Sequence, residues 1–156
     1  MAASPKPDSP EPYDICLPGK GWYDYWTGTQ LKGDKTKEIP RLDRLPVFVR
    51  PGAIIPRQPL VQSTSEEPSG PLQLDVYPGD RCWGELYLDD GSSIRGASLR
   101  QSIECNTTPF GLVLQFNTRE GTYRPWWTQI AVTVHGAKPG HMVIPDQPQA
   151  ATIHIQ

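Results

Sequence analysis

Apolar and polar residues alternate along much of the chain with a period of two, as they do in β-strands that bury one face. The alternation is clearest in Leu72–Tyr77, where leucine, leucine and valine are interleaved with glutamine, aspartate and tyrosine. No segment keeps a helical period over three turns. Strands are therefore predicted at residues 14–17, 22–26, 36–39, 47–50, 53–55, 72–77, 83–89, 99–105, 111–117, 129–135, 142–144 and 152–155.

Proline and glycine separate these apolar runs. Of the 156 residues, eighteen are proline and fourteen are glycine, and both residues favour tight turns. Residues 89–92, Asp-Asp-Gly-Ser, are predicted to form one such turn, and residues 119–127 a longer loop. Short strands joined by turns predict an all-β fold of antiparallel β-sandwiches, with a truncated proximal part and a distal sandwich.

A change in composition divides the chain. Residues 58–70 are rich in Ser, Glu, Pro and Gly and hold too little apolar surface to pack as a unit, so they are predicted to be a linker. The linker would join a partial proximal β-domain at residues 13–57 to a distal β-sandwich at residues 71–156. Residues 1–12 are polar and contain four prolines, which predicts a disordered lead or a remnant foreign to the fold.

Two phrases in the first third of the chain carry a specific resemblance. Residues 17–28 read Leu-Pro-Gly-Lys-Gly-Trp-Tyr-Asp-Tyr-Trp-Thr-Gly, and residues 42–56 read Leu-Asp-Arg-Leu-Pro-Val-Phe-Val-Arg-Pro-Gly-Ala-Ile-Ile-Pro. In this order and at this spacing, they resemble the segment that follows the catalytic barrel in family 31 glycoside hydrolases, the α-glucosidase and α-xylosidase group. The resemblance continues through residues 72–77 and 86–91, and more loosely through later strands.

The resemblance implies an accessory region. In that family the nucleophile and the acid/base are aspartates on a (β/α)8 barrel that lies upstream of the two phrases. Such a barrel takes about 250 residues, more than the 156 of this chain. We therefore expect C-terminal β-domains that support a barrel, with no catalytic residue and no activity of the chain by itself.

Other chemistries find little support in the residues. A glycosidase needs two carboxyl groups held about 5–9.5 Å apart, but Asp89 and Asp90 are predicted to form a turn, and Glu66 and Glu67 lie in the linker. Calcium binding by Asp80, Asp89 and Asp90 lacks a recognisable loop pattern. Zinc, serine-hydrolase and phosphate-loop motifs are absent from the sequence. We expect no metal and no cofactor, and a self-standing glycosidase is the least supported alternative.

The charge balance argues against two classes of partner. The formal net charge is −2 at pH 7, and no basic run offers a footprint for nucleic acid or for an anionic membrane. No apolar stretch approaches the roughly 18 residues of a membrane span. Neither nucleic acid nor a membrane is expected as a partner, and the cellular compartment is left open.

Three cysteines, Cys16, Cys82 and Cys105, are too widely spaced for a zinc site. They are interpreted as three reduced structural thiols, with a disulfide between Cys82 and Cys105 as the open alternative. Residues 106–108, Asn-Thr-Thr, match the acceptor motif for N-glycosylation, which has meaning only in a protein secreted by a eukaryote.

Consecutive tryptophans give the remaining functional hypothesis. Trp126 and Trp127 cannot both point into one core from a strand, so one is expected to be exposed or at an interface. An exposed indole can stack on a sugar ring, with Arg124 donating hydrogen bonds; the competing interpretation is that the pair packs against the barrel.

The predicted strand at residues 22–26 adds a second aromatic group. Trp22 and Trp26 share one of its faces, while Tyr23 and Tyr25 share the other. Both tryptophans are expected to pack inward and the tyrosines to lie at a domain seam, with a sugar-stacking platform as the alternative. The candidate residues for contact with an α-glucan are Tyr123, Arg124, Trp126, Trp127, Trp22 and Trp26.

The resemblance also bears on assembly. In family 31 enzymes an apolar segment opens the proximal domain before the Leu-Pro-Gly turn, and residues 1–12 hold no such run. The strand predicted at residues 14–17 would then have an unpaired edge, which invites pairing with another chain. A homo-oligomer through this edge is therefore expected, besides the barrel or an α-glucan as partner.

Overall fold

The computed structural model describes residues 11–41, 43–136 and 140–155, and every regular element in these ranges is a β-strand. The all-β fold class is confirmed. The lead predicted at residues 1–12 lies outside these ranges except for its last two residues. The strands are β1 (Tyr13–Cys16), β2 (Tyr23–Asp24), β3 (Lys35–Glu38), β4 (Phe48–Val49), β5 (Ala53–Arg57), β6 (Leu72–Tyr77), β7 (Cys82–Asp89), β8 (Ser98–Thr108), β9 (Gly111–Phe116), β10 (Glu120–Gly121), β11 (Gln129–Val134), β12 (Gly140–Pro145) and β13 (Ala151–Ile155).

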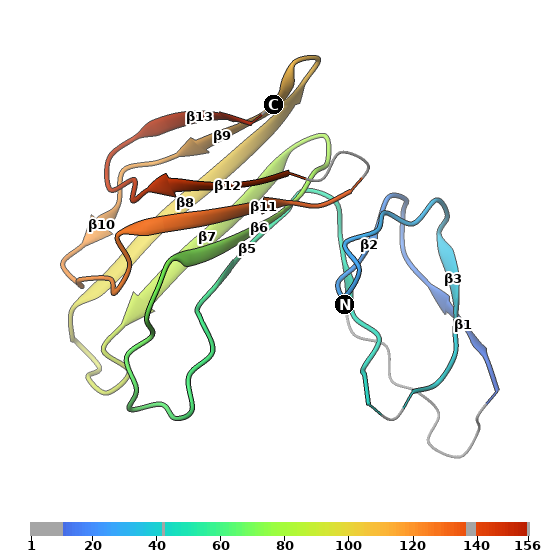
Figure 1. Ribbon diagram of the computed structural model, residues 1–156, viewed down its shortest axis with the longest axis horizontal. Coiled ribbons are helices and arrows are strands. Elements are labelled where there is room, and N and C mark those ends of the chain that lie inside the picture. Colours follow the sequence, from blue (N-terminus) through green and yellow to red (C-terminus); the bar gives the residue numbers. More distant parts are fainter. Residues whose placement is uncertain (1–10, 42, 137–139, 156) are drawn as a thin grey trace.

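One large sheet of nine strands dominates the molecule. Its order is β12-β11-β6-β5-β7-β8-β9-β13, with β10 beside β8. The sheet curls over, so that its two arms enclose one core (Figure 1). Its edge strands approach each other at one end, since a Cβ on Gly140 of β12 would lie 3.8 Å from Cγ2 of Ile155 on β13. The distal part is therefore a sandwich made from a single curled sheet.

Alternation along the strands decides which side chains fill this core. Leu74 and Val76 of β6, Leu114 of β9 and Val132 of β11 are all 0% exposed. Each such burial contributes about 1.5–3 kcal/mol relative to an exposed side chain. The predicted inward faces of the strands at residues 72–77 and 111–117 are confirmed.

Two strand pairs in the described residues are parallel, a feature that the predicted antiparallel order did not include. β6 runs parallel to β11, and β5 lies parallel to β7. The antiparallel pair of β5 and β6 lies between β11 and β7 in the sheet. This order makes β6 the neighbour of β11 and β5 the neighbour of β7. β5 precedes the predicted linker at residues 58–70, so these residues connect two neighbouring strands of the large sheet.

A disulfide joins the central strands. Cys82 on β7 and Cys105 on β8 stand directly opposite each other, with their Cα atoms 4.6 Å apart, and their sulfur atoms are bonded. The interpretation as three reduced thiols is therefore wrong. Cys16 is a free and exposed thiol.

The residues before β5 form a smaller unit, drawn in blue and cyan at the right of Figure 1. β1 pairs with β3, and β2 pairs with β4. Ile15, Leu17 and Phe48 form its buried core, with Trp22 packed against them.

A side-chain turn ends β2 earlier than predicted. Oδ1 of Asp24 accepts hydrogen bonds from the backbone N–H groups of Trp26 and Thr27 at 2.9 and 2.8 Å. An aspartate that bonds the backbone two or three residues ahead turns the chain. The alternation expected over residues 22–26 therefore stops at Asp24.

Candidate functional site

A charged and aromatic cluster lies where the smaller unit meets the large sheet. Asp75 of β6 is only 3% exposed. Its Oδ1 lies 3.0 Å from Nε2 of His135, and its Oδ2 accepts a hydrogen bond from Nε of Arg57. Because both carboxylate oxygens have partners, the buried charge is compensated.

Two tyrosines complete this seam cluster, which consists of Tyr23, Arg57, Asp75, Tyr77 and His135. The ring of Tyr77 stacks on that of His135 with centroids 4.4 Å apart, and Tyr23 meets Tyr77 edge-on at 5.4 Å. The Tyr23 hydroxyl donates to the carbonyl of Pro78 at 2.8 Å. Burial, assisted by the charge of Asp75, raises the pKa of Tyr77, so this phenol stays neutral. The expected seam position is found for Tyr23.

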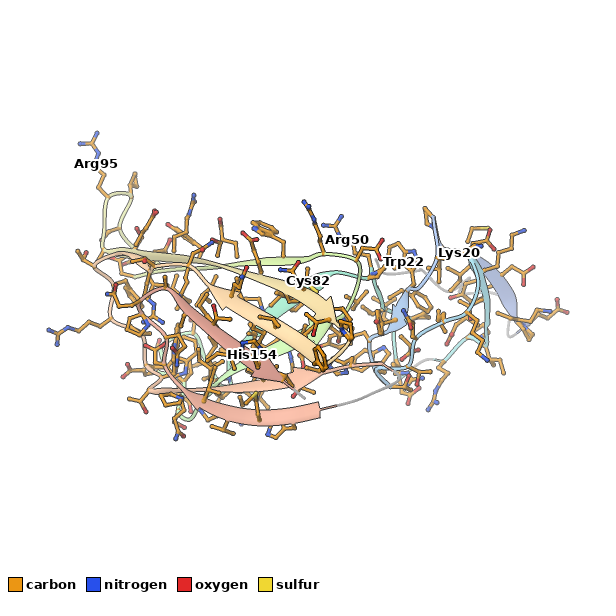
Figure 2. The ribbon with its side chains drawn as sticks, turned by 90° about the horizontal axis from the view of Figure 1, so that it is seen from above. Lys20, Trp22, Arg50, Cys82, Arg95 and His154 are labelled. Atoms are coloured by element: carbon orange, nitrogen blue, oxygen red, sulfur yellow. A yellow bond between two sulfur atoms is a disulfide. The ribbon has the colours of Figure 1, made fainter. Side chains whose placement is uncertain are left out.

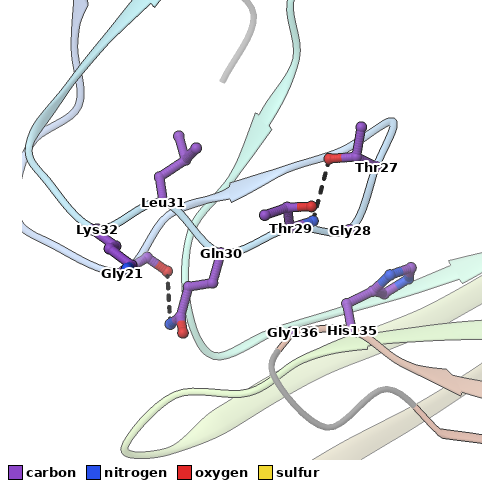
Figure 3. A pocket seen from close by; sticks show the side chains of 9 residues that line it. All are labelled: Gly21, Thr27, Gly28, Thr29, Gln30, Leu31, Lys32, His135 and Gly136. Carbon is purple, nitrogen blue, oxygen red and sulfur yellow. Dashed lines mark hydrogen bonds between the residues drawn. The ribbon is translucent and has the colours of Figure 1, made fainter.

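A cleft of about 520 Å³ opens beside the seam cluster, between residues 27–32 and the end of β11 (Figure 3). Gly28 approaches His135 so closely that a Cβ would lie 2.4 Å from its Nδ1. The described residues that line the cleft include His135 and Lys32 but no carboxylate. The cleft thus lacks the carboxyl pair that glycoside hydrolysis needs.

A second polar network surrounds Trp127, which is 3% exposed. Its Nε1 donates to Oδ1 of Asp146 at 2.9 Å, and Nη1 of Arg119 donates to Oδ2 at 2.7 Å. The guanidinium carbon of Arg119 lies 5.6 Å from the centre of the Trp127 ring. Buried Gln101 accepts hydrogen bonds from the same arginine. Trp127 is therefore part of the framework and has almost no surface to offer a ligand.

Opposing effects act on Asp146. Burial alone would raise its pKa, but hydrogen bonds from Arg119 and Trp127 and the positive charge of Arg119 outweigh burial, so the pKa of Asp146 is lowered. The carboxylate stays ionised and fixes the turn between β12 and β13.

Trp126 lies beside this network and is partly buried. Its ring meets that of Trp127 at 81°, with centroids 4.6 Å apart. Both indoles can turn toward the core because the residues lie in an irregular loop. That one member of the pair is exposed or at an interface stays a prediction for the partly buried Trp126. Trp126 and Tyr123 line a groove of about 710 Å³ together with Gln58 and residues 61–68 and 88–91, whereas Arg124 is exposed outside that lining.

The other two candidate tryptophans lie in the smaller unit, at the opposite end of the molecule from β10. Trp22 (labelled in Figure 2) is half-buried, and its Nε1 donates to the carbonyl of Pro18 at 2.8 Å. Trp26 is 48% exposed, with its Nε1 bonded to the carbonyl of Leu45. The expected inward packing of Trp26 was wrong, because the turn at Asp24 carries it to the surface.

The aspartates considered for catalysis or calcium do not converge. Oδ1 of Asp89 accepts from the N–H of Gly91, and Oδ1 of Asp90 accepts from Ser92 and Ser93, so both form the predicted turn. Asp80 lies at the other end of β7. Within the described ranges no three His, Cys, Asp or Glu residues gather as metal ligands, and no helix has the length and apolarity to cross a bilayer.

Sequence reasoning missed both buried networks. Asp75 occupies an outward position of β6, which alternation assigns to solvent, and only the parallel pairing of β6 with β11 brings His135 beside it. Arg119 and Asp146 lie in loops that carry no periodic signal.

Comparison with known proteins identifies the region. The description "Glycosyl hydrolase family 31 C-terminal domain" belongs to the family model that matches residues 4–55. This chain is related to family 31 glycoside hydrolases through their C-terminal region. It is 41% identical over 80 residues to an alpha-xylosidase from Saccharolobus solfataricus, and 33% identical over 140 residues to neutral alpha-glucosidase AB from Homo sapiens. These alignments cover 50% and 83% of this chain but 11% and 15% of the relatives.

Solved structures of the family share the fold. A GH31 dextranase from Flavobacterium johnsoniae matches with a TM-score of 0.81 at 20% identity, covering 97% of this chain and 25% of that one. The GH31 alpha-xylosidase from Xanthomonas citri matches with a TM-score of 0.73 at 23% identity, covering 93% of this chain and 17% of that one. The resemblance seen in the two phrases is confirmed, and it extends to the fold of nearly the whole chain.

Proposed function

We propose that this region is a non-catalytic accessory part of a family 31 α-glycoside hydrolase and supports its catalytic barrel. One observation carries the proposal: nearly the whole chain superposes on a region that makes up 25% of the dextranase chain. The cleft beside the seam cluster and the groove lined by Trp126 also favour the accessory role. The first lacks a carboxylate among its described residues, and in the second Asp89, Asp90 and Glu66 accept hydrogen bonds from their own backbone turns.

The smaller unit offers a surface that suits contact with a barrel. Trp26 and Leu45 are 48% and 47% exposed, and the indole of one bonds the carbonyl of the other. Arg44 lies over the Trp26 ring at 5.8 Å. Exposed apolar groups rimmed by a charge are typical of protein contact surfaces.

A chimera tests this support. The corresponding C-terminal region of the Saccharolobus solfataricus alpha-xylosidase is replaced by this chain, and thermal stability and hydrolysis of p-nitrophenyl α-xyloside are compared with those of a deletion variant. We expect the chimera to be folded and active and the deletion variant to be insoluble or much less stable. Full stability and activity of the deletion variant would contradict the proposal.

Paired substitutions then locate the contact. Trp26→Ser with Leu45→Ser is expected to lower the Tm of the chimera, because both side chains lose apolar area at the contact. Phe110→Ser is the control, since Phe110 is 90% exposed at the turn between β8 and β9 of the sandwich. Equal effects of the two changes would exclude Trp26 and Leu45 from the contact.

The groove beside Trp126 favours a second candidate function, weak binding of an α-glucan. It combines two aromatic side chains, Tyr123 and Trp126, with the amides of Gln58 and Gln62, and sugar sites use such a combination of stacking surface and hydrogen-bonding groups.

Fluorescence titration separates the two functions. Maltose, isomaltose and soluble starch are added to the chain, and release of product from p-nitrophenyl α-glucoside is followed in parallel. Saturable quenching that Trp126→Ala abolishes and Trp26→Ala preserves would support glycan binding at the groove. Fluorescence that does not change with added sugar would contradict glycan binding and leave the accessory role as the one remaining candidate. Release of product would favour the self-standing glycosidase.

A further inference from the structure

The acceptor motif at residues 106–108 occupies an accessible position on the large sheet. The chain has two asparagines, and Asn106 alone is followed two positions later by serine or threonine. β8 pairs with β7 only as far as Cys105, so Asn106 lies just beyond that ladder and pairs with β9 alone. Its side chain is exposed, as modification by an external enzyme requires.

An exposed tryptophan stands on the same face. Trp83 of β7 is opposite Glu104 of β8, and Asn106 lies two residues further along β8, so the three side chains share the outer face of the sheet. Such a diagonal pair of positions lies about 7–8 Å apart. Trp83 is 54% exposed, and with Arg81, Glu104 and Asn106 it lines a surface cleft of about 490 Å³.

The disulfide is an independent observation that points the same way. Cys82 and Cys105 immediately precede Trp83 and Asn106 in the chain, and their bond fixes these two positions relative to each other. Disulfides form and persist in oxidising compartments such as the lumen of the endoplasmic reticulum. Transfer of N-linked glycans takes place in that same lumen.

We propose that Asn106 is an N-glycosylation site and that the first N-acetylglucosamine of its glycan packs on the indole of Trp83. In the transfer, Nδ2 of Asn106 forms a bond to C1 of the sugar and loses a proton. The bond from C1 to the diphosphate of a polyprenyl-linked oligosaccharide donor breaks, and the diphosphate leaves with the electron pair. Arg81 and Glu104 flank the cleft and supply hydrogen-bonding groups for the sugar hydroxyls.

The modification is tested by directing the full chain into the secretory pathway of a eukaryotic cell. Intact mass is measured before and after treatment with peptide N-glycosidase. The unmodified sequence and Thr108→Ser are expected to lose mass on treatment, because both keep the motif, whereas Asn106→Gln and Thr108→Val are not. Thr108→Ser also keeps the hydroxyl that donates to the carbonyl of Gly111 at 2.8 Å. Secreted, folded protein without a glycan, or a glycan that persists in Asn106→Gln, would overturn the site.

A second measurement tests the packing on Trp83. The Tm of the glycosylated chain is expected to exceed that of the same protein expressed as Asn106→Gln by about 2–4 °C, the shift typical of one stacking contact in a chain of this size. Trp83→Ala should remove this difference. Tyr87→Ala is the matched control, because Tyr87 is 51% exposed on the same face of β7 and should leave the difference intact. An unchanged difference in Trp83→Ala would overturn the packing.

Discussion

Asp75 and Asp146 show how single carboxylates hold separate segments together in this fold. Asp75 links β6 to Arg57 of β5 and to His135 after β11. Asp146 links the turn after β12 to Arg119 and Trp127. A hydrogen bond to a charged group typically contributes about 1.5–3 kcal/mol, and the contribution of Arg57 to the Asp75 pair is smaller because its side chain is 43% exposed.

Gly28 is the residue at which the seam is most sensitive to a single added carbon. Its φ is +68°, and a Cβ would lie 2.4 Å from Nδ1 of His135. Gly28→Ala should therefore cost about 1–3 kcal/mol for the backbone and further free energy for displacing the His135 ring. Gly19→Ala is the control, because Gly19 also has a positive φ, +82°, but has nothing within 4 Å of its Cβ position. If urea unfolding shows that both variants lose the same free energy of unfolding, the result would contradict the contact between Gly28 and His135.

Acid should destabilise the protein through Asp146. Its pKa is lowered in the folded chain relative to the ordinary value near 3.8, so below that pH the unfolded chain binds more protons than the folded one. The stabilisation is therefore complete above about pH 5 and is lost as the pH falls through the ordinary pKa toward the lower folded value. Asp146→Asn should be less stable at neutral pH, by roughly 1.5–3 kcal/mol, and should show a flatter dependence of stability on pH below 5. If the free energy of unfolding fell with pH equally in Asp146→Asn and in the unsubstituted protein, the result would contradict this assignment.

At the scale of elements, the local sequence pattern predicted where the strands lie better than it predicted how they pair. Alternation and turn residues placed the strands of the sandwich within a few residues, because one buried face per strand is a local property of the sequence. The exception is β10 (Glu120–Gly121), a short exposed strand within the residues 119–127 that were predicted to be a loop. The pairing of β6 with β11 joins Val76 to Val134 across the chain, and nothing local encodes it. The seam cluster depends on that pairing, so Asp75 and His135 could not be brought together from sequence. Trp26 was misplaced for a local reason, the competing turn at Asp24.

The disulfide between β7 and β8 should contribute strongly to stability. It closes a loop between residues 23 positions apart, and restricting an unfolded chain by a loop of this size is worth about 3 kcal/mol. Reduction, or Cys82→Ala with Cys105→Ala, should lower the free energy of unfolding by that amount. Cys16→Ser should leave it unchanged, because that thiol is free and exposed. Identical unfolding curves for the oxidised and reduced protein would show that the bond does not constrain the unfolded chain.

At the scale of the whole molecule, the protein combines a broad sandwich with a small unit that packs against it through Tyr23 and Val49. Tyr23 contacts Tyr77 and the carbonyl of Pro78, and Gly28 lies against His135. Among its described residues, the small unit has its own core cluster of three buried side chains, and its two other buried apolar side chains, Tyr23 and Val49, pack with Tyr77 of β6. So small a core cannot fold by itself. Its order therefore depends on the sandwich beneath it, and an added partner such as a barrel would stabilise it further.

The edge of β1 gives the last prediction. Among the described strands, β1 pairs only with β3, and we expect its other edge to pair with a second copy. Light scattering should then give a mass that rises with protein concentration. Cys16 lies on this strand and is exposed, so a disulfide between two copies could produce the same mass. Cys16→Ser under reducing conditions distinguishes them: a mass that still rises supports pairing through the strand edge, and a constant monomer mass rules it out.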